Sequence, residues 1–229
     1  MGVTNPTILA FDTSAAHCAA AILQRDAIVA ERIALMGRGQ AEHLMPMLEA
    51  LLSEVALGWK DLHYLAVGIG PGNFTGTRIS VAAARGLALA LRIPAIGVSS
   101  FEVMRDPAGP GAHPAEIVSI EAPRGAAYVQ RFGHGRPQSA PRLIAPDAPP
   151  EDLRLPVNMR VRGYRADDIA RPFGAEASDA VLEDIACRIA RIADWRLSQG
   201  EKPDRPAPLY VRPADAAPPS EAPPVILPG

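Results

Sequence analysis

The chain has 229 residues, 23 basic and 25 acidic side chains, a net charge of −2, and 48% hydrophobic residues. These values permit a buried core in one large domain or two lobes, and they exclude wholesale disorder and a generally basic nucleic-acid binder. Two cysteines cannot build a disulfide framework or a four-ligand zinc site, and neither a signal peptide nor a membrane span is apparent, so we expect a cytoplasmic protein.

The first third of the chain predicts three strands and a helix. Apolar runs at 7–12, 18–23 and 27–33 are typical of strands, and the polar turn 24–26 joins the last two as a hairpin. A helix is predicted over about 40–57, because its apolar residues recur with a period of 3.6. These residues are Leu44, Met47, Leu48, Leu51, Leu52 and Val55.

The next segment continues as an α/β chain. The apolar run 62–69 predicts a central parallel strand, 75–91 a helix rich in Ala, Gly and Leu, and 94–98 a further strand. The order β-β-β-α-β-α-β predicts an initial hairpin followed by right-handed crossovers. The fold class is therefore α/β.

Proline separates the two halves of the chain. Only four of the 24 prolines lie in the first 100 residues, so the second half is predicted to be a looser lobe. We expect paired strands at 116–121 and 126–132, a third amphipathic helix over roughly 177–197, and a short strand or extended segment at 208–212. The predicted divisions are 1–104, 105–213 and a Pro-rich tail at 214–229.

Asp12 ends the first strand and is the first candidate for chemistry. Actin-like ATPases and sugar kinases place a magnesium-linked aspartate at such a position, over a hairpin whose glycines let backbone N–H groups approach phosphates. The hairpin here has no glycine at 15–18. A phosphate loop therefore stays open as an interpretation, but an Asx turn that caps the strand is favoured.

The stretch GPGNFTG at 70–76 is the most distinctive motif. It turns a strand into a helix, and the Thr75 hydroxyl is predicted to cap that helix. It matches neither a Walker A loop nor GxGxxG, so a tight turn and a ligand loop are equally compatible with it. A vestigial phosphate site would use Asp12, Thr13, Ser14, Gly70, Gly72, Thr75 and Gly76.

The sequence predicts neither a metal site nor a catalytic residue. His43 is the only histidine in the first helix, and the positions three or four residues away hold no usual metal ligand. The motifs GxSxG, HExxH and CxxC do not occur in the sequence. Cys18 lies within a strand pattern and is most simply a small core residue.

The two predicted helices of the first half are apolar enough to have two apolar faces each. Small residues in 75–91 let another helix approach closely. This surface packs either on the chain's own sheet or on another subunit. The predicted partner contacts are Leu44, Met47, Leu48, Leu51, Val81, Ala84, Leu87 and Leu91. Replacing Leu48 or Ala84 with Arg is expected to break such a contact, because it would bury a charge without a partner.

Four segments of the first 105 residues resemble the TsaB family, also called YeaZ. They are ILAFDTS (8–14), AEHLMPMLEALL (41–52), LAVGIGPGNFTGTRISVAAARGLALAL (65–91) and IPAIGVSSFEVM (93–104). Beyond them the similarity is thin. EAPRGAAYV (121–129) resembles a family segment that usually reads Asp-Ala-Arg-Arg-Gly-Glu-Val-Tyr, and PLYVR (208–212) resembles the family's closing strand.

This resemblance implies an actin-like ATPase fold of two ribonuclease-H-like lobes, with mixed sheets flanked by helices. It implies a non-catalytic scaffold needed to make threonylcarbamoyladenosine beside the anticodon of tRNA. The implied partners are the catalytic paralogue TsaD, bound through the two helices, a TsaE-like ATPase, the enzyme that makes threonylcarbamoyl-adenylate, and tRNA through the complex. ATP and a metal would then belong to these partners, and the isolated chain can form homodimers.

The sequence leaves two other functions open besides the one that this resemblance implies. One is a small ATP-dependent phosphotransferase of the actin-like and sugar-kinase superfamily, with Asp12 as its metal-linked carboxylate. The other is a peptidase, which has the least support, because the sequence offers neither a metal pair nor a nucleophile with an adjacent base.

Overall fold

Strand β1 (Thr7–Asp12) is the centre of the first sheet, and all of its side chains are buried. Neighbouring residues of a strand point to opposite faces. Leu9 and Phe11 therefore pack on one side of the sheet, and Ile8 and Ala10 pack on the other. An apolar run of this kind needs a helical layer on each face of the sheet.

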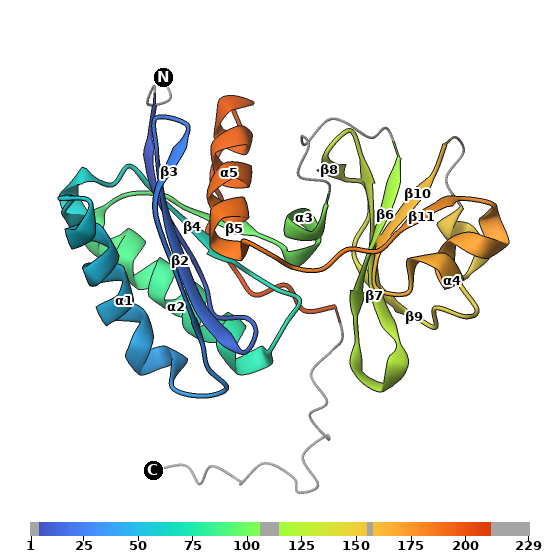
Figure 1. Ribbon diagram of the computed structural model, residues 1–229. Helices are drawn as coiled ribbons and strands as arrows, with labels where there is room; N and C mark the ends of the chain where they lie inside the picture. Colours follow the sequence, from blue (N-terminus) through green and yellow to red (C-terminus); the bar gives the residue numbers. More distant parts are fainter. Residues whose placement is uncertain (1–4, 106–114, 155–157, 212–229) are drawn as a thin grey trace, which may run out of the picture.

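The computed structural model describes residues 5–105, 115–154 and 158–211. Its first sheet has the strand order β3-β2-β1-β4-β5, with an antiparallel hairpin at one side and parallel strands at the other. The added strands are β2 (His17–Gln24), β3 (Ala27–Leu35), β4 (Tyr64–Gly68) and β5 (Ala95–Val98). One face is covered by α1 (Gln40–Glu54) and α2 (Phe74–Leu91), as Figure 1 shows.

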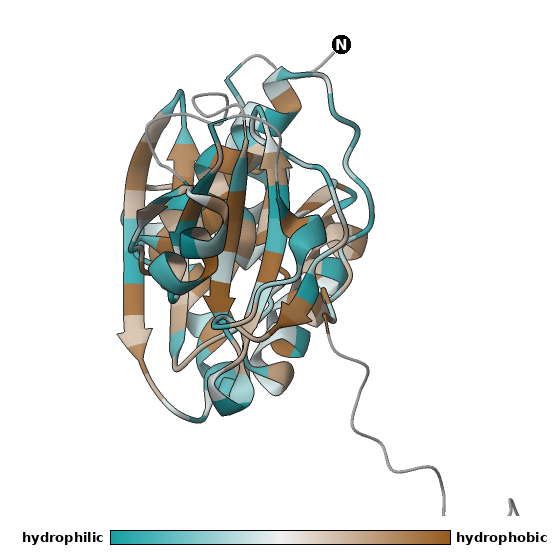
Figure 2. Cartoon of the chain, turned by 90° about the vertical axis from the view of Figure 1, so that its right-hand side faces the viewer, coloured by the Kyte–Doolittle hydropathy of each residue, from teal (hydrophilic) through white to brown (hydrophobic). Residues whose placement is uncertain are grey.

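The second sheet repeats this combination of parallel and antiparallel strands. Its order is β11-β10-β6-β7-β8, and β9 also pairs with β7. The strands are β6 (Glu116–Glu121), β7 (Ala127–Gly133), β8 (Arg136–Pro137), β9 (Arg142–Ile144), β10 (Arg160–Gly163) and β11 (Glu176–Ser178). Helix α4 (Ala166–Ala170) packs against β10 and β11. In Figure 2, which looks onto this lobe, apolar colour is concentrated in the strands.

Short helical pieces complete the two lobes. Helix α3 (Ser100–Met104) lies between the lobes, where Phe101 and Met104 pack against the second sheet. The described residues also form the 3₁₀ turns η1 (Trp59–Asp61), η2 (Pro123–Gly125), η3 (Glu151–Leu153) and η4 (Arg171–Phe173). Within the described ranges, no helix is both long and apolar enough to cross a bilayer.

The α/β class with two mixed sheets is confirmed, and the predicted helices of the first half are close to α1 and α2. The third helix was predicted over roughly 177–197, and the predicted start is wrong. Helix α5 spans Ile185–Ser198, and Asp184 before it has a left-handed backbone. Residues 208–210 have no regular secondary structure, and residue 212 and the predicted tail at 214–229 lie outside the described ranges.

Helix α5 returns to the first lobe after the second lobe has been formed. Its buried residues Ile189, Ala190 and Ala193 pack against β1 and its neighbours, on the face opposite to α1 and α2. In Figure 1 it stands beside the first sheet. The second layer of the first lobe is therefore supplied by residues that follow the second sheet in sequence.

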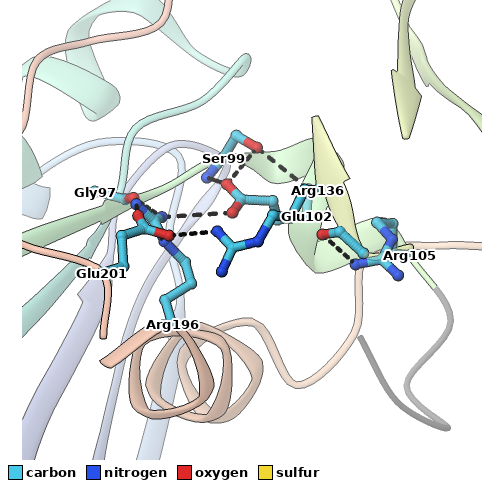
Figure 3. A network of polar contacts seen from close by, with 8 residues as sticks. Gly97, Ser99, Glu102, Arg105, Arg136, Arg196 and Glu201 are labelled. Carbon is cyan, nitrogen blue, oxygen red and sulfur yellow. Dashed lines mark hydrogen bonds and ion pairs between the residues drawn. The ribbon is translucent and has the colours of Figure 1, made fainter. Parts of the chain in front are cut away.

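Arg196 in the last turn of α5 links the two lobes. Its guanidinium donates to the Gly97 carbonyl at 2.7 Å, lies 3.4 Å from Glu102 Oε1, and pairs with Glu201. Glu201 Oε2 in turn accepts from Arg136 Nη1 of β8 at 2.8 Å, so the network in Figure 3 joins both lobes. Burial alone would raise the pKa of Glu201, but hydrogen bonds from Arg196 and Arg136 outweigh burial and lower this pKa.

We expect Arg136→Ala to lower the free energy of unfolding by up to about 1 kcal/mol at neutral pH, because the ion pair is partly exposed. The pKa of Glu201 is depressed in the folded state, so its pairing contributes stability above the ordinary carboxyl pKa of about 4.3 and loses it as the pH falls further. The effect of Arg136→Ala should therefore shrink below about pH 4. Urea titrations at neutral pH and below about pH 4 measure this difference. Arg124→Ala, which removes an exposed arginine, is the control. An effect of equal size at both values would contradict the prediction.

Candidate functional site

Asp12 lies at the end of β1, and one oxygen of its carboxylate is bound by neighbouring groups of the chain itself. Its Oδ1 accepts from the Ser14 backbone N–H and the Ser14 hydroxyl, each at 2.9 Å, and lies 2.7 Å from His17 Nε2. The bond to the amide two residues later is an Asx turn. Asp12 is only 1% exposed, so the turn interpretation fits this residue better than a metal-linked carboxylate does.

The glycine of β4 makes room for this arrangement. A side chain at Gly68 would place its Cβ 1.8 Å from Asp12 Oδ2. The neighbouring Cys18 is buried in the core of the first lobe, as predicted, and burial, with a smaller effect of Asp12, raises the pKa of its thiol to about 11. A thiol with so high a pKa is a poor nucleophile at neutral pH.

The GPGNFTG motif forms the turn that leads into α2. Its helix is capped by Asn73, whose Oδ1 accepts from the Gly76 backbone N–H at 3.0 Å. The prediction that Thr75 supplies this cap is therefore wrong, because Thr75 already lies inside the helix and is exposed. Gly70 has a positive φ of 84°, and its carbonyl accepts from the Ser100 N–H at 2.8 Å. The turn is thus tied to the start of α3.

The loop after β1 and the motif are brought together, as the sequence suggested for a phosphate site, but they bind each other. The Asn73 N–H donates to the Ser14 carbonyl, and the Thr13 hydroxyl donates to the Gly76 carbonyl at 2.7 Å. A Cβ at Gly76 would lie 1.9 Å from the Thr13 carbonyl oxygen, and one at Gly72 would lie 2.4 Å from the Ser14 carbonyl oxygen. Carbonyl oxygens therefore lie at the N-terminus of α2, where a phosphate would need free N–H groups.

A cavity of about 240 Å³ lies between the lobes beside these loops. Asp12 and Ser14 contribute to its wall from the first lobe, and Glu121 and Tyr128 contribute from the second. The remaining described lining is mostly apolar and includes no arginine or lysine. Nucleoside polyphosphates need cationic or N–H donors around their phosphates, so this wall is poorly matched to them.

The side chains predicted to contact a partner are mostly inside the first lobe. Six of the eight are at most 3% exposed, and they are Leu44, Met47, Leu48, Leu51, Val81 and Ala84. Leu87 and Leu91 are partly buried against the same core. The period of 3.6 identified the stripe that faces the chain's own sheet, because that stripe carries the large apolar residues. Naming the buried six was therefore wrong, while contact through the two helices stays a prediction.

The outer surface of α2 carries apolar residues besides the eight predicted partner contacts. Leu89 is 82% exposed and Phe74 is 46% exposed, with Ala82 and Gly86 exposed between them. Apolar residues occur on all sides of this helix, and this pattern in the sequence indicates that its outer side can also contact another protein. His43 is exposed on α1. Within the ranges described, no group of three or more His, Cys, Asp or Glu could hold a metal ion.

Comparisons with known proteins relate the chain to the TsaD and TsaB proteins. Residues 34–138 match the family model described as "TsaD: tRNA N6-adenosine threonylcarbamoyltransferase". The Bacillus subtilis "tRNA threonylcarbamoyladenosine biosynthesis protein TsaB" is 37% identical over 124 residues, which are 53% of this chain and 53% of that protein. A Mycobacterium tuberculosis protein described as uncharacterized is 32% identical over 215 residues, which are 93% of this chain and 94% of that protein.

The solved structures give the same result across both lobes. A Pseudomonas aeruginosa protein, described as similar to the peptidase YEAZ, matches with a TM-score of 0.71 and 25% identity over 90% of this chain and 100% of that one. The fold is therefore the two-lobed, actin-like class that the resemblance to the TsaB family implied. The matches to curated TsaB proteins span about half of their length, 46% for Buchnera aphidicola and 53% for B. subtilis.

Proposed function

Because the chain belongs to the TsaB (YeaZ) family, we propose that it is a non-catalytic subunit required to form threonylcarbamoyladenosine in tRNA. Its catalytic partner in this proposal is a TsaD-like paralogue. A TsaE-like ATPase and the enzyme that makes threonylcarbamoyl-adenylate complete the pathway. We assign ATP and metal handling to these partners, and tRNA meets the chain through the complex.

A non-catalytic role is supported above all by the start of α2, where carbonyl oxygens of the chain lie in the place that a phosphate would need. Thr13 and Ser14 place their carbonyl oxygens against Gly76 and Gly72, and the Asp12 carboxylate is held by Ser14 and His17. The groups that would bind phosphate and magnesium in a kinase-like cleft are thereby used as internal structure. This arrangement supports a scaffold built on a nucleotide-binding architecture.

The rival function is an ATP-dependent phosphotransferase that uses Asp12. Isothermal titration of the purified chain with Mg-ATP separates the two. We expect no binding at micromolar concentration. Micromolar affinity for Mg-ATP that is lost in Asp12→Asn would support the phosphotransferase. It would also contradict the inference that the chain's own carbonyl oxygens exclude a phosphate from the start of α2.

The pathway and the partner contact are tested together in cells. Depletion of the chain should lower threonylcarbamoyladenosine in bulk tRNA, measured by mass spectrometry. Wild-type chain should restore it, whereas Leu89→Arg should not, because a charge on the outer surface of α2 would face an apolar part of the partner without a counter-charge. Leu143→Arg, which changes another exposed leucine on β9, is the matched control and should restore the modification. Undiminished modification after depletion would contradict the proposal.

A further inference from the structure

The cavity of about 240 Å³ between the lobes combines two carboxylates with an apolar wall. Asp12 at the end of β1 and Glu121 at the end of β6 contribute the carboxylates, and Tyr128 of β7 adds an aromatic ring. The apolar side chains of the wall include Val98, Val103, Ile120, Leu182, Ile185 and Ile189. An engineered apolar cavity of about 150 Å³ can bind benzene, so this space is large enough for a small organic molecule.

Asp12 has one carboxylate oxygen that the chain leaves unbound. The Ser14 backbone N–H, the Ser14 hydroxyl and His17 all contact Oδ1. Within the described ranges no hydrogen bond reaches Oδ2, and the chain does not seal this atom off. Asp12 is 1% exposed and lies next to Gly68, and both residues line the cavity, so Oδ2 faces it. A carboxylate oxygen in so buried a position is stabilised by a donor that carries positive charge.

The charged groups of the described wall favour a cation. The side chain of Glu121 is exposed, and it forms no ion pair in the described part of the chain. An anion would be repelled by Glu121 and Asp12, because the described lining contains no arginine or lysine to compensate them. The ring of Tyr128 also favours a cation, since the face of an aromatic ring attracts positive charge.

The apolar part of the wall distinguishes an organic cation from a metal ion. Mg²⁺ requires oxygen ligands or ordered water on all sides, and isoleucine, leucine and valine side chains offer none. The same side chains bury the hydrocarbon part of an organic ligand favourably. The wall therefore matches a molecule with a positively charged end and an apolar body.

We propose that this cavity binds a small organic amine in its protonated form. The ammonium group of the amine donates to Asp12 Oδ2, and its apolar body packs among the apolar side chains of the wall. The ligand contacts both lobes, because Ile120 and Tyr128 belong to the second lobe and Asp12 belongs to the first. Binding should raise the midpoint of thermal unfolding, since the ligand stabilises only the folded chain. This inference does not rest on the proposed function.

Isothermal titration of the purified full chain with benzylamine at neutral pH tests this proposal. Benzylamine carries an ammonium group on a compact apolar ring, and we expect a dissociation constant of about 1 mM or less. Benzyl alcohol and benzoate carry a neutral and a negative group on the same ring. Each of them should bind at least about tenfold more weakly than benzylamine, because neither supplies a positively charged donor to Asp12.

Substitutions in the wall locate the site. Asp12→Asn keeps the size of the side chain and removes its charge, so it should weaken benzylamine binding by roughly tenfold or more. Glu121→Gln should weaken binding by roughly threefold, because water screens an exposed carboxylate. Glu151→Gln, the same change at an exposed residue of η3 outside the described wall, should leave the affinity within about twofold of wild type. Thermal unfolding checks that each variant is folded, and if Asp12→Asn is not, Glu121→Gln and the two analogues still decide.

Several results would overturn the inference. Benzylamine that does not bind at concentrations up to about 10 mM would show that the cavity has no affinity for amines. Equal affinity for benzylamine and benzyl alcohol would show that apolar contact alone accounts for binding. Benzylamine binding that Asp12→Asn leaves unchanged would place the amine elsewhere, and displacement of benzylamine by Mg²⁺ would assign the carboxylates to a metal ion. Each of these results would leave the proposed function intact, because that function is tested by the tRNA measurement.

Discussion

Leu48→Arg should unfold the first lobe instead of only preventing association. Leu48 is fully buried, and it belongs to the same core cluster as Phe11 and Leu51, between α1 and the first sheet. An arginine there would bury a charge without a partner in a closely packed site, which should cost at least about 3–5 kcal/mol. That is a large part of the roughly 5–15 kcal/mol that stabilise a typical domain. Far-UV circular dichroism and urea titration measure the loss.

The next residue along α1 provides the control. Glu49 is exposed, so Glu49→Arg should change the free energy of unfolding by no more than about 0.5 kcal/mol. Leu48→Arg with a wild-type urea midpoint would contradict the burial of this residue. It would also return Leu48 to the set of residues available to a partner.

Gly76→Ala is expected to destabilise the chain by about 3 kcal/mol or more, although alanine is ordinarily the better helix residue by about 1 kcal/mol. The added Cβ would lie 1.9 Å from the Thr13 carbonyl oxygen, which is backbone and cannot rotate away. The hydrogen bond from the Thr13 hydroxyl to the Gly76 carbonyl holds the two segments at this distance. The loop after β1 must therefore move, and the turn around Asp12 should be disturbed with it.

Gly86→Ala in the same helix separates this effect from helix propensity. Apart from the adjacent residues and the backbone of its own helix, a Cβ at Gly86 would have no atom within 4 Å, so the substitution should stabilise the chain by about 0.5–1 kcal/mol. Urea titration of the two variants should give changes of opposite sign. A stabilising Gly76→Ala would show that the loop and the helix are not in contact in solution.

The first lobe could be predicted because its local signals agree with its packing. The period of 3.6 in 44–55 and the apolar runs at 7–12 and 62–69 each place residues where the fold buries them. The second lobe offers weaker signals. Strand β10 contains Arg160 and Arg162, which are unusual in a strand paired on both sides. Arg160 pairs with the buried Glu116, and such a long-range pairing has no signature in sequence.

The candidate site shows a similar division. The sequence placed Asp12 and the GPGNFTG motif at strand ends that meet, and the absence of glycine at 15–18 correctly favoured a turn at Asp12. It gave no indication that the Thr13 and Ser14 carbonyls fill the start of α2, because that depends on distances of a few ångströms. Six of the eight residues predicted to contact a partner are buried in the first lobe, because periodicity shows that a stripe is apolar and does not show which neighbour covers it.

The return of α5 to the first sheet has a consequence for synthesis on the ribosome. A nascent chain that has emerged only as far as residue 104 carries the complete first sheet, yet Ile8, Ala10 and Val98 still lack the helix that covers them. This apolar face of the sheet stays exposed to water until about a hundred further residues have been translated, which takes on the order of ten seconds. During this interval the nascent chain exposes an apolar surface that chaperones can bind. The first lobe can complete its folding only after the second lobe has been synthesised.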